Sequence, residues 1–68
     1  MTSIDREFRQ YGVEFFGEAA MANLTDEQIE EARVWAMNEL ADLTEKYGRQ
    51  EKGTARELFC NYLFDKFI

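Results

Sequence analysis

The 68-residue sequence contains no histidine, no proline and a single cysteine, Cys60. Without a second cysteine, the chain cannot form an internal disulfide. Without histidine, it has no imidazole to activate a serine or cysteine nucleophile or to complete a Cys₂His₂ zinc site. A lone thiol fits a reducing compartment, and no apolar stretch is long enough to span a bilayer. We therefore expect a cytoplasmic protein.

Glycine is scarce, and acidic residues outnumber basic ones. Two of the four glycines, Gly48 and Gly53, enclose the polar stretch "GRQEKG", which indicates a loop. Fourteen acidic and eight basic residues give a net charge of −6. A charge of this sign disfavours direct binding to nucleic-acid phosphates or anionic lipid, and it suits a protein partner with a basic surface.

Apolar residues recur at spacings of three and four, which predicts an all-α fold. We expect one domain spanning residues 1–68, with three helices at 4–22, 26–47 and 54–67. The first helix would bury one apolar stripe: Ile4, Phe8, Tyr11, Phe15, Ala19 and Ala22. Its glycines weaken helical propensity and allow a bend or a break.

The second helix has the clearest boundaries. Thr25 and Gln28 have the spacing of a capping box, and Leu24 and Ile29 occupy the positions of a hydrophobic staple. Gly48 follows as the expected C-terminal glycine. The predicted buried stripe is Ile29, Ala32, Ala36, Leu40, Leu43 and Tyr47.

The third helix should begin at Thr54, with Glu57 as its capping-box partner. Most of its circumference is apolar: Ala55, Leu58, Phe59, Cys60, Tyr62, Leu63, Phe64 and Phe67. A helix with so much apolar surface must be covered on more than one side. Either it is the central helix of the bundle, or its outer side meets another chain. In the second case, Phe64 and Phe67 are the candidates for self-association.

Two further apolar strips border the predicted core faces. They are Val34, Met37 and Ala41 on the second helix, and Val13, Phe16 and Ala20 on the first. We interpret both as extensions of the core. The alternative is that a second copy of the chain packs on them.

Negative charge is concentrated on the second helix. Residues 24–47 carry −5, residues 1–23 carry −2 and residues 48–68 carry +1. Trp35 lies among carboxylates, about 120° from the centre of the buried stripe. Either another helix covers it, or it is an interface anchor with an acidic rim. The candidate partner-binding residues are Glu27, Glu30, Glu31, Trp35, Glu39 and Asp42.

No enzyme motif is present, and we expect no catalysis, no cofactor and no metal. Cys60 lies among apolar residues with no base to activate it, so we interpret it as a core residue. The carboxylates of "DEQIEEA", residues 26–32, fall on regular helix without the loop that a calcium site needs. We interpret them as a solvated face.

Size and charge together favour a non-catalytic, acidic protein-interaction module. Such chains are typical of small phage- or plasmid-type inhibitors, including anti-CRISPR and anti-restriction proteins. Carboxylates would take the place of phosphates on the basic, nucleic-acid-binding surface of the partner, in the manner of a DNA mimic. The alternative is a homo-oligomeric structural or scaffold protein whose acidic surface keeps it soluble.

A third hypothesis comes from two short blocks, "LTDEQI" at 24–29 and "LADLT" at 40–44. Together with Ala36 and their mutual spacing, they resemble the Hha-type nucleoid modulators, small helical proteins that bind H-NS-like DNA-binding proteins. The resemblance implies an adaptor that captures a DNA-bound regulator. At the family's charged Asp-His-Arg centre, this sequence has Met37, Asn38 and Glu39, so the resemblance implies no site residues here.

Overall fold

The computed structural model describes the backbone of residues 3–68 and the side chains of residues 6–51 and 53–68. The described chain is helical without strands, which confirms the predicted all-α class. It has four helices: α1 (Ser3–Phe16), α2 (Glu18–Ala22), α3 (Asp26–Tyr47) and α4 (Lys52–Lys66). The predicted stripe residue Ile4 has its side chain outside the described part.

The first helix, expected over residues 4–22 with a bend or a break allowed at its glycines, is divided at Gly17 into α1 and α2. Gly17 has a φ of 94° and a ψ of 159°, a conformation open almost only to glycine. After the break, α2 brings Met21 back onto α1, where only 2% of it is exposed. A Cβ at Gly12 would overlap the Met21 thioether. Gly12 therefore allows the close approach of α1 and α2.

The break also changes which residues of this region are buried. Phe8 is buried and Tyr11 is half-buried, as the stripe predicts. Phe15 was expected to be buried as well, but it is 65% exposed, and Ala19 and Ala22 are exposed too. An uninterrupted helix would have continued the stripe through these three residues. With the turn at Gly17, Met21 packs in the core instead.

The start of α3 matches the prediction. The Thr25 hydroxyl accepts a hydrogen bond from the Gln28 backbone N–H at 3.1 Å, and Gln28 Oε1 accepts one from the Thr25 N–H at 2.9 Å. This reciprocal pair is the predicted capping box. The helix ends at Gly48, whose φ of 90° explains the glycine there.

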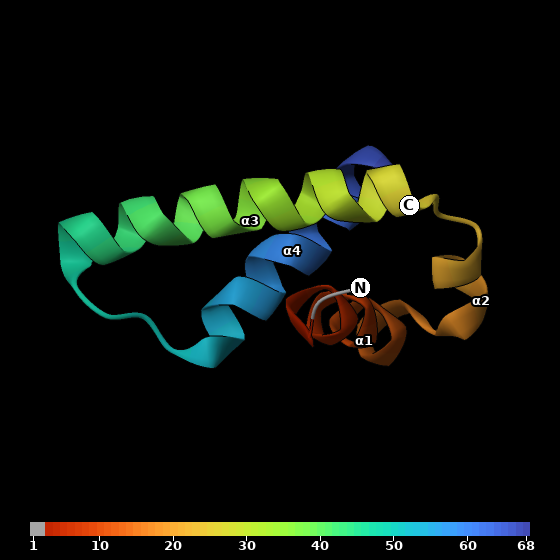
Figure 1. Cartoon of the computed structure of the whole chain (residues 1–68), viewed down its shortest axis with the longest axis horizontal. Coiled ribbons are helices and arrows are strands. Elements are labelled where there is room, and N and C mark those ends of the chain that lie inside the picture. Colours follow the sequence, from red (N-terminus) through yellow and green to blue (C-terminus); the bar gives the residue numbers. More distant parts are fainter. Residues whose placement is uncertain (1–2) are drawn as a thin grey trace.

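Only the first half of the predicted α3 stripe is fully buried. Ile29, Ala32 and Ala36 are buried, but Tyr47 is 76% exposed, so its expected burial is wrong. The C-terminal half of α3 extends beyond its crossing with α4, and the following loop returns the chain to the start of α4 (Figure 1). Residues near the end of α3 therefore have less protein to pack against.

The last helix begins earlier than the sequence indicates. Glu51, without a side-chain capping bond, is its N-cap. Thr54 lies inside the first turn, where its N–H donates to the Glu51 carbonyl at 3.0 Å. The predicted start at Thr54, with Glu57 as its capping-box partner, is therefore wrong.

α4 packs against both α3 and α1, as expected for a central helix. Figure 1 shows α4 crossing α3, with α1 seen nearly end-on beside it. The Phe59 ring meets the Phe8 ring edge-on, with centroids 5.1 Å apart. The buried apolar core comprises Phe8, Met21, Ile29, Ala32, Ala36, Phe59, Cys60 and Leu63.

Candidate protein-interaction surface

One side of α3 is exposed along most of its length. At 100° per residue, nine of its exposed residues fall within about 140° of the helix circumference, and the exposed residues Asp26, Thr44, Lys46 and Tyr47 lie outside this arc. We call the nine residues within the arc the α3 outer face: Glu27, Glu30, Glu31, Val34, Met37, Asn38, Ala41, Asp42 and Glu45. It carries five carboxylates and no basic residue.

The α3 outer face also has an apolar strip. Val34 is 44% exposed and Met37 is 39% exposed. Ala41, the next residue of the strip, is also exposed. The interpretation of these three residues as core is therefore wrong, because the described helices pack on the other side of α3. On α1, the matching residues Val13 and Phe16 are half-buried and do pack against the core.

The carboxylates of this face differ in their surroundings. Arg33 donates to both Glu30 oxygens, and these hydrogen bonds lower the pKa of the Glu30 carboxyl. Glu31 accepts a hydrogen bond from the Tyr62 hydroxyl at 2.6 Å. For Glu27 and Asp42, the described part of the chain shows no ion pair or hydrogen-bonded side-chain partner. Glu27 and Asp42 can therefore bind a lysine or arginine of a partner without first breaking an ion pair or side-chain hydrogen bond among the described residues.

Two of the predicted partner-binding residues, Trp35 and Glu39, lie outside the α3 outer face and are half-buried. Trp35 packs against the core, and its ring lies 5.0 Å from that of Tyr62 at an interplanar angle of 33°. The sequence left two hypotheses for Trp35, coverage by another helix or a role as an exposed interface anchor. In the structure α4 partly covers Trp35, so only part of its indole is accessible to a partner.

Sequence reasoning missed five members of the α3 outer face as binding candidates. Asn38 and Glu45 were not considered, and Val34, Met37 and Ala41 were assigned to the core. The sequence did hold one indication that this strip is exposed. Around the axis of α3, the apolar strip lies opposite the core-facing residues Ala32, Ala36 and Leu43. That indication is ambiguous, because a wide apolar arc is also what a helix covered on two sides has.

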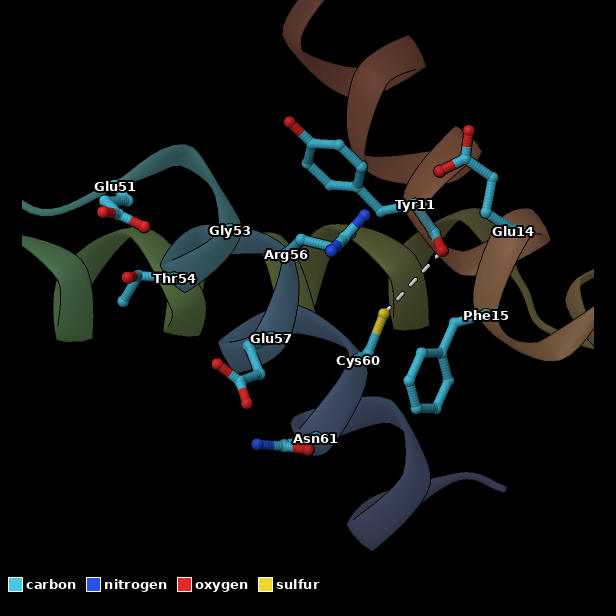
Figure 2. Close-up of a pocket in the computed structure, with 10 residues that line it drawn as sticks. All are labelled: Tyr11, Glu14, Phe15, Glu51, Gly53, Thr54, Arg56, Glu57, Cys60 and Asn61. Atoms are coloured by element: carbon cyan, nitrogen blue, oxygen red, sulfur yellow. Dashed lines mark hydrogen bonds between the residues drawn. The ribbon is translucent and has the colours of Figure 1, made fainter.

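A second feature is a solvent-open cleft of about 530 Å³ between α1 and α4. Figure 2 shows the aromatic rings of Tyr11 and Phe15 on the α1 side and the Cys60 sulfur between the helices. The other residues that line it are Glu14, Glu51, Gly53, Thr54, Arg56, Glu57 and Asn61.

The cleft gives Cys60 an unreactive environment. Its thiol donates a long contact to the Tyr11 carbonyl oxygen, with Sγ 3.8 Å from the oxygen. Burial raises the pKa of the thiol, and the positive charge of Arg56 opposes that rise only in part. Because the thiolate is the nucleophilic form, this arrangement disfavours reaction at Cys60.

The aromatic residues predicted for self-association have different positions. Phe64 is 65% exposed. Phe67 is half-buried, packs against the core, and has its ring centroid 6.2 Å from that of Tyr62. Phe64 therefore has more surface to offer a second chain than Phe67 has.

No group of three or more potential metal-ligating side chains comes together in the described part of the chain. None of its helices is both long and apolar enough to cross a membrane. In comparisons with known proteins, no protein family, no curated protein and no solved structure matches this chain.

Proposed function

We propose that the chain is a non-catalytic protein-interaction module whose α3 outer face docks on a basic surface of a partner protein. The observation that carries the proposal is the exposed apolar strip of Val34, Met37 and Ala41 beside five carboxylates. Protein interfaces commonly combine an apolar centre with a polar rim. Here both parts lie on one regular helix.

The charge of the α3 outer face defines the chemistry of its partner. Carboxylates without local counter-ions attract lysine and arginine, accelerate association and disfavour acidic partners. Basic surfaces of this kind are the ones that bind nucleic-acid phosphates. A chain that occupies such a surface inhibits the partner by competing with nucleic acid for it. We place this activity in the cytoplasm. Small inhibitors of the phage or plasmid type have this mode of action.

The experiment is capture of partners on the immobilised chain from the lysate of its natural host, followed by a competition assay. Each captured protein is purified and tested for nucleic-acid binding with and without the chain. The test variant is Glu27→Lys combined with Asp42→Lys, since both residues are exposed and unpaired among the described side chains. The control is Glu7→Lys combined with Glu18→Lys, which makes the same charge change at exposed positions of α1 and α2.

We expect the chain to displace nucleic acid from the captured protein, with an affinity that falls as salt rises. The α3 variant should bind at least about tenfold more weakly, because it places like charges across the interface. The control should bind nearly as the wild type does. An equal loss of affinity in both variants would show that the effect comes from net charge alone. Equal affinity of the wild type and both variants would exclude the α3 outer face as the binding surface.

A further inference from the structure

A second apolar surface lies where α1 and α4 meet. Phe15 and Phe64 are each 65% exposed. Phe15 borders the cleft beside Cys60 and Asn61 (Figure 2). Phe64 follows those two residues by one helical turn, so it lies on the same side of α4 as the cleft.

On this surface, the exposed ring of Phe64 and the cleft between α1 and α4 are neighbours. Phe64 projects from α4, and the neighbouring cleft of about 530 Å³ has Tyr11 and Phe15 along its α1 side. A surface with both features is self-complementary, as a two-fold symmetric dimer requires. We propose that a second copy of the chain binds here, with Phe64 of each copy seated in the cleft of the other.

The distribution of charge favours this surface as the contact between copies. Each chain carries −6, and residues 24–47 account for −5 of it, whereas residues 48–68 carry +1. Two copies that met through the α3 outer face would bring ten carboxylates together. At the cleft, three glutamates are accompanied by Arg56, for which the described chain shows no ion pair. Arg56 can pair with a glutamate of the second copy.

The exposed area also fits the centre of a dimer interface. An aromatic side chain carries about 150–250 Å², so each of the two phenylalanines exposes roughly 100–160 Å². With the apolar walls of the cleft, the patch reaches a few hundred Å². A standard interface buries about 800 Å² per partner, and its centre is the most apolar part.

The experiment is sedimentation velocity on the purified chain from low micromolar to near-millimolar concentration. We compare wild type, Phe64→Ala and Phe15→Ala with Tyr47→Ala as the matched control. Tyr47 is an aromatic residue at the end of α3 that is 76% exposed and is not among the residues that line the cleft. Circular dichroism on each variant checks that the helices remain.

We expect wild type and Tyr47→Ala to dimerise and each phenylalanine variant to dimerise about thirtyfold more weakly, the effect of removing an aromatic hot spot. Added salt should preserve or strengthen the dimer, because it screens the repulsion between like-charged chains. This is opposite to the salt dependence of binding through the α3 outer face, so each proposal can fail independently. A wild type that stays monomeric, or a dimer that survives both phenylalanine substitutions, would overturn the inference.

Discussion

Tyr62 and Glu31 are joined by a hydrogen bond in which the Tyr62 hydroxyl donates to Glu31 Oε2 at 2.6 Å. The bond links α4 to the edge of the α3 outer face. The same Tyr62 ring packs against Trp35 and Phe67, and the Lys66 ammonium lies 5.6 Å from its centroid. Tyr62 is thus a residue of α4 that contacts both Glu31 and Trp35 of α3.

We expect Tyr62→Phe to lower the urea midpoint of unfolding modestly. The substitution removes the hydrogen bond to Glu31 but keeps the ring that packs on Trp35. The decrease should be smaller than for Tyr62→Ala, which removes both. Tryptophan fluorescence and circular dichroism during urea titration measure it. Equal midpoints for wild type and Tyr62→Phe would show that the bond adds nothing to stability.

The same bond predicts a loss of stability at alkaline pH. The hydrogen bond to Glu31, together with burial and the Glu31 charge, raises the pKa of the Tyr62 phenol above its ordinary value of 10.0. The folded state therefore holds this proton more tightly than the unfolded state does. Its stabilising effect is complete below pH 10.0 and is lost as pH rises through the raised value. Wild type should lose more stability over this range than Tyr62→Phe, as measured by urea titrations at each pH.

Phe59 and Phe64 should respond very differently to truncation. Phe59 is completely buried and meets Phe8, whereas Phe64 is 65% exposed. We expect Phe59→Ala to lower the free energy of unfolding by about 3–5 kcal/mol. Phe64→Ala should change it by no more than about 0.5 kcal/mol when measured at concentrations where the chain is monomeric. Urea titration of both variants measures this, and a large loss for monomeric Phe64→Ala would contradict the observed burial.

Alanine should have opposite effects at two glycines with open space around them. Apart from the adjoining residues and the local helix backbone, no atom lies within 4 Å of a Cβ built at Gly17 or at Gly53. Gly17 has a φ of 94°, so alanine there should destabilise the fold by about 1–3 kcal/mol. Gly53 lies in α4 with no positive φ, so alanine there should stabilise it by up to about 1 kcal/mol. Thermal and urea unfolding measure both, and stabilisation by Gly17→Ala would disprove the backbone explanation.

Cys60 should be slow to react while the chain is folded. It is 2% exposed, and burial raises the pKa of its thiol, so both access and thiolate content are low. Labelling with a thiol reagent should accelerate sharply in urea. Cys60→Ser should lower the free energy of unfolding by about 1–3 kcal/mol, the effect of burying a hydroxyl. It should leave binding through the α3 outer face unchanged. Fast labelling of the native chain would refute the assignment of Cys60 to the core.

The sequence by itself determined the class of the fold and the ends of α3. The capping box of Thr25 and Gln28 and the glycine after Tyr47 are local signals, because each depends on residues within one or two helical turns. The burial of Phe8, Ala32, Ala36 and Phe59 also followed from the spacing of apolar residues. The concentration of negative charge on α3 needed no structure at all.

Only the tertiary structure decided which apolar residues stay exposed. The turn at Gly17 sends Met21 into the core and leaves Phe15 outside, and the crossing of α4 with α3 covers Trp35 but not Val34 or Met37. Helical spacing shows which residues share a face of one helix. Whether another helix covers that face depends on the directions in which the helices cross, and those are set by contacts between residues far apart in the sequence.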